Sequence, residues 1–154
     1  MDAKIQGETI HFRIPSNPRY VPTIRRAILS LAGSLDFPQQ TAEDIHLSAA
    51  EAITNTVEHG SPCQKTNAVI VDCRVADGTL TIDVHDEGTG FEMPDSGIFE
   101  ASLDEHGRGL RLIYNLMDNV KVRRTPKGSR IRMVKKNPYT KLSKVAAGQP
   151  RSSS

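Results

Sequence analysis

The segment from Ile45 to His59 has a two-faced helical pattern that constrains the fold more than any other feature of the sequence. Polar residues recur every four positions, which places them along one side of a helix: Glu51, Asn55 and His59. A mostly apolar stripe occupies the other side: Ile45, Ala49, Ala52, Ile53, Thr56 and Val57. We therefore expect a helix that packs on a sheet and presents a carboxylate, an amide and an imidazole on its free face. Thr41 and Asp44 are expected to form a capping box at its start, and Gly60 to end it.

Alternating apolar and polar residues predict strands elsewhere in the chain. Residues 8–14 form one such segment, and residues 68–75 and 80–84 form two more around Asp77-Gly78, a preferred hairpin turn. Residues 120–125 and 129–135 predict a second hairpin. A further helix is expected after Asn17-Pro18, and another is expected to open at Gly107.

The order strand, helix, helix, hairpin, loop, helix, hairpin predicts the α+β class. We expect a two-layer sandwich in which a mostly antiparallel sheet carries its helices on one face. The domain is assigned to residues 1–137 of the 154, and residues 138–154, which lack periodicity, are expected to form a disordered tail.

Composition and cysteine usage narrow the class of protein. With 37% hydrophobic and 25% charged residues the chain is typical of soluble globular proteins, and no apolar run approaches membrane-spanning length. No secretory leader is recognisable at the N-terminus. Cys63 and Cys73 do not have a metal-binding spacing, and Cys73 falls on the inward side of a predicted strand, where a reduced thiol is expected. We therefore expect a cytoplasmic protein.

Charge is unevenly distributed, although the formal net charge is only +2. Residues 75–107 contain many acidic residues and no Lys or Arg, whereas the chain from Arg108 to Lys136 is rich in both. This division predicts one acidic and one basic side, which steers partners. The basic hairpin lacks interleaved aromatic side chains for base stacking, so we expect a solvated sheet surface there and no direct nucleic-acid contact.

Two glycine motifs follow the two-faced helix. Asp86-x-Gly88-x-Gly90 stands where a strand ends, so its backbone can approach a planar ligand closely and its carboxylate can accept from an exocyclic amine. Gly107-x-Gly109, at the expected start of a helix, offers free N–H groups to phosphate. Either motif alone is a common turn, but their order after a Glu-x-x-x-Asn helix is specific.

These motifs are similar to those of the GHKL-type ATPases, and the chain most closely resembles the small bacterial anti-sigma factors that are also serine/threonine-protein kinases. Glu51-x-x-x-Asn55 resembles the family's N box, residues 86–91 its first glycine box, and residues 107–110 its second. Gly128-Ser129 stands where the family commonly has Gly-Thr. The resemblance covers roughly residues 10–136 and implies the Bergerat ATPase fold with a bound Mg-ATP.

The resemblance also implies roles for individual residues. Asp86 would hold the adenine amine, and Asn55 would bind Mg²⁺. Glu51 would be the catalytic base that deprotonates a serine or threonine hydroxyl of a partner protein. The remaining nucleotide contacts would come from a further set of positions: Gly88, Gly90, Gly107, Arg108, Gly109, Leu110 and Ser129.

The resemblance implies a stress-response regulator of transcription that phosphorylates a STAS-type anti-sigma factor antagonist, sequesters a sigma factor and forms a homodimer without contacting a membrane. Two alternatives stay open. A non-catalytic nucleotide-binding protein could switch partners by binding alone. The short, acidic lid segment, which has no Lys or Arg before Arg108, favours it, while intact Glu51 and Asn55 favour the kinase. The ATPase half of a histidine kinase is disfavoured, because no helical segment with a phosphorylatable histidine precedes the domain.

Overall fold

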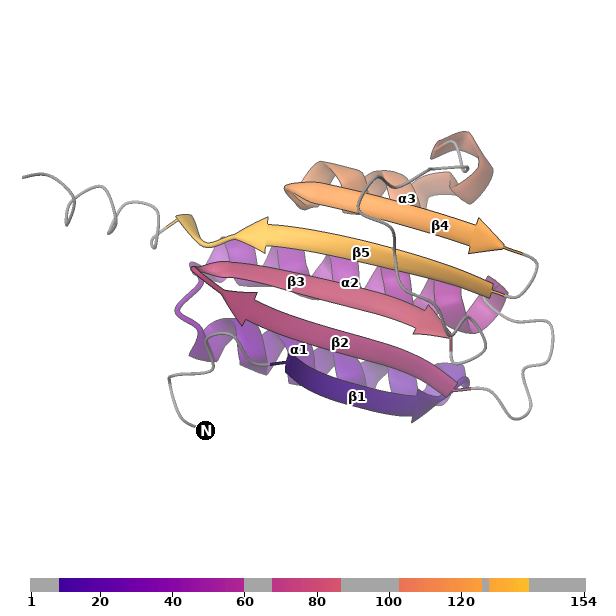
Figure 1. The fold of residues 1–154 in the computed structure, drawn as a ribbon, viewed down its shortest axis with the longest axis horizontal. Helices are drawn as coiled ribbons and strands as arrows, with labels where there is room; N and C mark the ends of the chain where they lie inside the picture. The colour runs from indigo at the N-terminus through magenta and orange to yellow at the C-terminus, as the bar shows by residue number, and fades with distance from the viewer. Residues whose placement is uncertain (1–8, 60–67, 87–102, 126–127, 139–154) are drawn as a thin grey trace, which may run out of the picture.

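The computed structural model describes residues 9–59, 68–86, 103–125 and 128–138. Gly88, Gly90 and all but the first residue of the expected tail lie outside these ranges. The described residues form five strands, one short 3-10 helix and three α-helices (Figure 1), in this order: β1 (Thr9–Pro15), η1 (Pro18–Tyr20), α1 (Val21–Ser34), α2 (Gln39–His59), β2 (Ala68–Ala76), β3 (Thr79–Asp86), α3 (Leu103–Leu116), β4 (Asn119–Thr125) and β5 (Gly128–Lys136).

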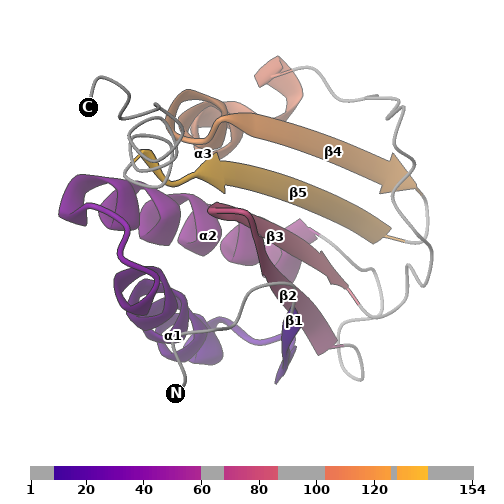
Figure 2. The ribbon, with the colours of Figure 1, turned by 60° about the vertical axis from the view of Figure 1, so that its left-hand side comes forward.

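The strands form one antiparallel sheet in the order β1-β2-β3-β5-β4. All three α-helices lie on the same face of this sheet, as Figure 2 shows, and no helix of the described residues covers the other face. The predicted α+β sandwich is therefore confirmed. The last hairpin inserts β5 next to β3, so β4 becomes one edge of the sheet and β1 the other.

The core lies between the helices and the inward side of the sheet. The apolar stripe of α2 is buried as predicted, including Ile45 and Ile53. Thr56 is buried in the same stripe, where its hydroxyl donates to the backbone oxygen of Ala52 at 2.9 Å, so burial leaves the hydroxyl satisfied. Cys73 is a free, buried thiol on the inward side of β2, which confirms its predicted position.

The first hairpin turns as its sequence predicts. Asp77 and Gly78 have positive φ angles of 51° and 71°, and these two residues alone form the loop between β2 and β3. Two consecutive residues with positive φ characterise the turn whose twist matches that of the flanking strands. The Asp-Gly pair thus sets the register in which Ala76 pairs with Thr79.

Two predicted helix starts are wrong. Helix α2 begins at Gln39, and the amide of Ala42 donates to the oxygen of Pro38, so Thr41 lies inside the first turn and is not the cap. Asp44 instead accepts a hydrogen bond from the side chain of Gln40 at 3.0 Å. Helix α3 begins at Leu103, four residues before Gly107. Gly107 and Gly109 therefore lie within the helix and do not begin it.

Residues at the end of β5 and directly after it bond to α1, the first hairpin and α3. Asn137 is buried, and its side-chain amide donates to the backbone oxygens of Leu35 and Asp36, both at 3.2 Å. Its backbone amide donates to the oxygen of Gly78 at 2.8 Å. The ammonium of Lys135 donates to the oxygen of Leu116, the last residue of α3, at 2.6 Å. The bonds to the carbonyl oxygens of Leu35 and Leu116 satisfy groups that the ends of α1 and α3 leave open.

Candidate nucleotide and catalytic site

The polar face of α2 meets α3 at Gly109. Glu51 and Asn55 are half-buried, and both lie within contact distance of the place where a Cβ of Gly109 would stand. Such an atom would be 2.6 Å from Oε2 of Glu51 and 3.7 Å from Nδ2 of Asn55. The structure therefore brings the expected N box and second glycine box together, as the sequence predicted.

Helix α3 is held in this position by its own apolar stripe. Leu110 and Ile113 are buried in the core, and Met117 follows them one turn later. Leu110 was expected to contact the nucleotide, and the structure gives its side chain a packing role beside Gly109. Because these residues fix the rotation of α3, the glycine side of the helix faces α2.

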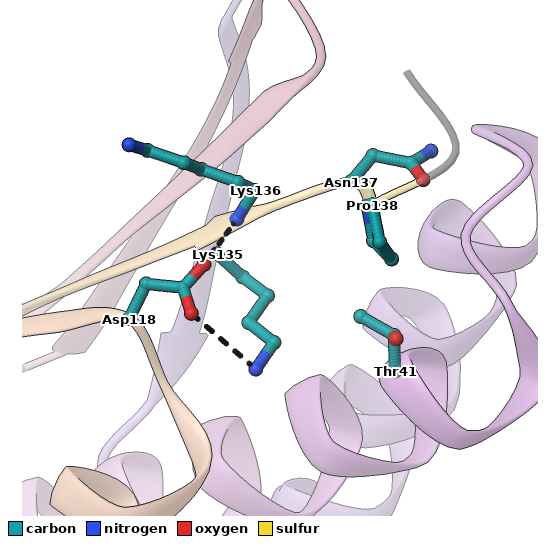
Figure 3. Close-up of a pocket in the computed structure, with 6 residues that line it drawn as sticks. All are labelled: Thr41, Asp118, Lys135, Lys136, Asn137 and Pro138. Carbon is teal, nitrogen blue, oxygen red and sulfur yellow. Dashed lines mark hydrogen bonds and ion pairs between the residues drawn. The ribbon is translucent and has the colours of Figure 1, made fainter. Parts of the chain in front are cut away.

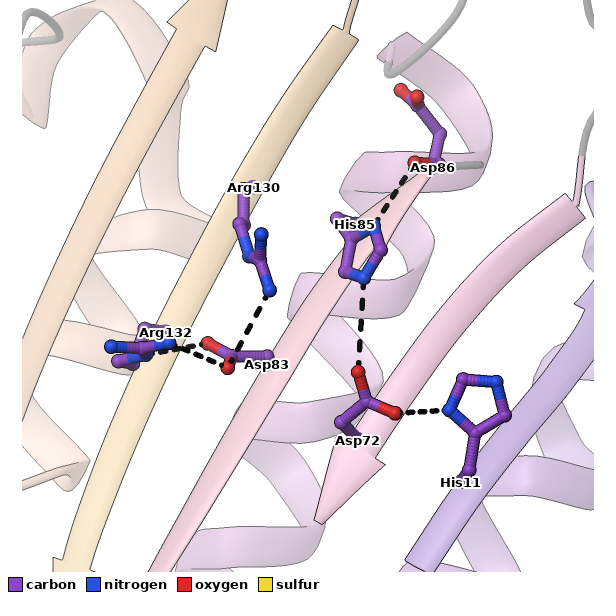
Figure 4. Close-up of polar contacts among 7 residues, drawn as sticks. All are labelled: His11, Asp72, Asp83, His85, Asp86, Arg130 and Arg132. Atoms are coloured by element: carbon purple, nitrogen blue, oxygen red, sulfur yellow. Dashed lines mark hydrogen bonds and ion pairs between the residues drawn. The ribbon is translucent and has the colours of Figure 1, made fainter. Parts of the chain in front are cut away.

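Asp86 closes β3 at the same end of the molecule. In Figure 1 the end of β3, the end of α2 and the beginning of α3 all lie at the right, and Figure 2 agrees. Asp86 points to the helix side of the sheet with the inward residues Ile82 and Val84, and it is only 1% exposed. A carboxylate in such a buried position is stabilised by hydrogen-bond donors, and an exocyclic amine of a base can be one of them. The backbone oxygen of Asp86 contacts Nδ1 of His85 at 3.0 Å (Figure 4).

The other predicted site residues are placed to different degrees. Ser129 lies in β5 opposite Arg124, near the start of that strand. Gly107 and Arg108 lie in α3, one turn after its start, so their amides are beyond the four helix residues that lack an intrahelical acceptor. The expectation that Gly107 stands at a helix N-terminus is therefore corrected. Gly88 and Gly90 lie outside the described residues.

The residues present fit a magnesium nucleotide. Mg²⁺ prefers oxygen ligands, keeps several waters and takes one or two protein groups, so the side-chain oxygen of Asn55 is an adequate ligand. Within the described residues, no group of three or more His, Cys, Asp or Glu side chains is arranged so that it could hold a metal ion, so they contain no dedicated all-protein cage. Because Gly109 has no side chain, the backbone of α3 comes close to Glu51 and Asn55, which a larger residue at that position would prevent.

A separate cavity of about 460 Å³ lies at the opposite end of the sheet (Figure 3). It is lined by Thr41, Asp118, Lys135, Lys136, Asn137 and Pro138. The ammonium of Lys135 is already engaged by the oxygen of Leu116 and by Asp118, whose Oδ1 is 3.7 Å away. We therefore assign the polar groups of this cavity to holding the ends of α3 and β5.

The helix-free face of the sheet carries a polar network that the sequence did not reveal (Figure 4). Asp72 lies between two histidines: it contacts His11, and its Oδ2 is 3.8 Å from Nε2 of His85. Asp83 binds Arg132 and also approaches Arg130 at 3.9 Å. The outward position of the arginines was predicted, but their side chains are only 20% and 12% exposed, so they are not simply solvated. Only the alternation of polar residues in the strands could have pointed to this face.

Within the part of the chain that the structure describes, no helix has the length and apolarity needed to cross a bilayer.

Comparison with known proteins identifies the family. A family model described as histidine kinase-like ATPase domain matches residues 14–135. The serine-protein kinase RsbW of Bacillus licheniformis is 33% identical over 128 residues, covering 77% of this chain and 80% of that protein. The serine-protein kinase RsbW of Bacillus subtilis is 31% identical over 128 residues, which cover 77% of this chain and 80% of that protein.

Solved structures with low sequence identity share the fold. The crystal structure of the RsbU and RsbW domains of a Mycobacterium tuberculosis protein superposes with a TM-score of 0.61 at 15% sequence identity. The match covers 83% of this chain and 32% of that one. The histidine kinase domain of a blue-light activated kinase from Erythrobacter litoralis is 23% identical with a TM-score of 0.52, covering 84% of this chain and 64% of that one. With motifs, fold and relatives in agreement, the chain belongs to the serine-protein kinase RsbW family of histidine kinase-like ATPases, a family of ATP-dependent serine kinases.

Proposed function

We propose that this protein is a cytoplasmic anti-sigma factor that uses Mg-ATP to phosphorylate a serine or threonine of a STAS-type antagonist. In its other state it sequesters a sigma factor, so that phosphorylation of the antagonist regulates transcription under stress. The observation that carries the proposal is the contact of Glu51 and Asn55 with Gly109, because it joins a base, a metal ligand and the second glycine box. A homodimer is part of the proposal, and β1 at the edge of the sheet offers a surface for it.

Each site residue has a stated task in this proposal. Asp86 accepts a hydrogen bond from the adenine amine, with Gly88 and Gly90 close to the base, and Asn55 supplies an oxygen ligand to Mg²⁺. Gly107, Arg108, Gly109 and Ser129 contact the phosphates, beside Leu110. Because Gly107 lies one turn inside α3, its amide reaches phosphate only if the first turn of α3 opens.

Glu51 removes the hydroxyl proton of the acceptor serine. The serine oxygen then forms a bond to the γ-phosphorus, and the bond between that phosphorus and the bridging oxygen breaks, leaving the electron pair on ADP. When bound, ATP would supply the transferred phosphoryl group, and Mg²⁺ would neutralise part of its negative charge. Positioning and charge neutralisation provide most of the catalysis in such transfers, so one carboxylate and one amide are sufficient side-chain equipment.

The test is transfer of label from γ-labelled ATP, with Mg²⁺, to the STAS-type protein that co-purifies with this chain from its native cell. Glu51→Ala should abolish labelling of serine or threonine while nucleotide binding persists, because a general base contributes about 10²- to 10⁴-fold. Glu43→Ala is the matched control, since Glu43 is exposed on the same helix. Nucleotide binding without transfer by the wild-type chain would instead support partner switching by binding alone, which the absence of Lys and Arg in residues 75–107 favours.

A further inference from the structure

We propose that Gly109 is a positioning residue for Glu51: its missing side chain is what allows the Glu51 carboxylate to occupy its present place. The inference rests on the proposed function, in which Glu51 is the base. It assigns Gly109 a role beyond contact with phosphate, because the glycine then acts on the chemistry through a residue of another helix.

The contact is too close for any side chain at Gly109. A Cβ there would stand 2.6 Å from Oε2 of Glu51 and 3.6 Å from its Cδ. Favourable contacts between nonbonded carbon atoms lie at about 3.5–4.0 Å, so the distance to the oxygen describes a clash. The distance to Nδ2 of Asn55, 3.7 Å, is an ordinary contact, so Asn55 could stay where it is.

The packing of α3 determines which group moves when this clash is introduced. Leu110, next to Gly109, is buried, and Ile113 is buried one turn further on, so α3 cannot withdraw from α2 without exposing core side chains. Glu51 is a long, half-buried side chain whose carboxylate can rotate away. A methyl group at Gly109 should therefore displace the carboxylate of Glu51 and leave the fold intact.

The displacement matters because proton transfer depends on the position of the base. An error of about 1 Å in such a position can lower a rate roughly 10²-fold. Gly109→Ala keeps its backbone amide, so a hydrogen bond from that amide to phosphate would remain. The expected signature is a loss of turnover with little change in Mg-ATP affinity.

Gly33 provides a matched control. It lies in α1, and a Cβ built there would have nothing within 4 Å. Gly33→Ala thus adds the same methyl group to a helix and raises helix propensity in the same way, without touching the site.

The experiment compares the wild type, Gly109→Ala, Gly33→Ala, Glu51→Ala and the double variant Gly109→Ala/Glu51→Ala. The first readout needs no nucleotide: the ¹³C carboxyl resonance of Glu51, assigned with Glu51→Gln, should move in Gly109→Ala and stay in place in Gly33→Ala. Calorimetry with Mg-ATP and single-turnover phosphoryl transfer to the co-purified antagonist supply the second and third readouts. Transfer by Gly109→Ala should be on the order of 10²-fold slower than wild type. The double variant should be no slower than Glu51→Ala, because the glycine acts through that carboxylate.

Several results would overturn the inference. These are an unmoved Glu51 resonance in Gly109→Ala, wild-type turnover in Gly109→Ala, or a loss of turnover on adding Gly109→Ala to Glu51→Ala that equals its effect in the wild type. An unfolded Gly109→Ala would also overturn it, since the clash would then not be relieved by Glu51 alone. Failure of the wild type to transfer phosphate would defeat the proposed function and leave the resonance test to decide the position of Glu51.

Discussion

Arg132 donates two parallel hydrogen bonds to the carboxylate of Asp83, from Nε to Oδ1 at 2.8 Å and from Nη2 to Oδ2 at 2.9 Å. The two residues are direct partners in the register of β5 with β3, and Asp83 is buried. Two-point binding of a carboxylate by a guanidinium is among the strongest polar contacts in proteins, and it joins the second hairpin to the first. On the helix-free face of the sheet, β3 and β5 are thus connected by two residues that are 49 positions apart in the sequence.

Removing the carboxylate should destabilise the protein. We expect Asp83→Ala to lower the free energy of unfolding by about 3–5 kcal/mol, because it leaves half-buried guanidinium groups without their counter-charge. Arg74→Ala, an exposed position on the same face, should change it by less than about 0.5 kcal/mol. Urea unfolding followed by circular dichroism measures both, and equal effects of the two substitutions would contradict the assignment.

The buried thiol of Cys73 should be almost inert in the native state. Burial, with smaller contributions from Asp72 and Asp83, raises the pKa of Cys73 from 9.0 to about 12. Because the thiolate is the reactive form, native labelling near neutral pH should be roughly 1000-fold slower than in urea, as a shift of three pH units implies. The measurement is alkylation kinetics in a Cys63→Ser background, and comparable rates in buffer and urea would contradict it.

The same raised pKa predicts a loss of stability in alkaline solution. The folded protein keeps Cys73 protonated up to about pH 12, whereas an unfolded chain releases that proton above about pH 9.0. The contribution of this thiol is therefore fully present below pH 9.0 and is lost as pH rises toward 12. Denaturant unfolding between pH 8 and 11 should show a decline that is shallower in Cys73→Ala, after allowance for the lower starting stability of that variant. A parallel decline would show that Cys73 does not contribute.

The first hairpin should depend on Gly78. Its φ of 71° lies in the left-handed region, so Gly78→Ala should lower the free energy of unfolding by about 1–2 kcal/mol. Gly33→Ala, in helix α1, should raise the free energy of unfolding by about 0.5–1 kcal/mol. The same substitution is thus expected to stabilise the protein at one site and destabilise it at the other. Thermal melting of both variants provides the check, and a stabilising effect of Gly78→Ala would exclude the strained turn.

Asp86 should control affinity for adenine nucleotides. Losing a hydrogen bond to a charged group weakens binding by about 1.5–3 kcal/mol, so Asp86→Asn should raise the Kd for Mg-ATP about 10- to 100-fold. Asp118→Asn, at the other end of the sheet and partly exposed, should leave the Kd unchanged. Calorimetric titration decides between them, and unchanged affinity in Asp86→Asn would remove this residue from the site.

Local pattern in the sequence determined the elements of this fold and the residues that we propose for its chemistry. The four-residue spacing of Glu51 and Asn55, the alternation of the strands and the Asp77-Gly78 turn are set by neighbours a few positions away, so all were readable in advance. The order of motifs identified the family for the same reason. The starts of α2 and α3 were predicted less well, because several residues near Thr41 and Gly107 could each begin a helix and local pattern does not choose between them.

Only the tertiary structure decided which segments meet. That β5 lies between β3 and β4, that Arg132 holds Asp83, and that Gly109 stands against Glu51 all depend on how α3 and the last hairpin pack on the rest. Contacts of this kind join residues about 50 positions apart, and a periodic pattern within one element carries no information about its neighbour in space. The sequence predicted the candidate site residues, whereas the close approach of Gly109 to Glu51, on another helix, arises from packing.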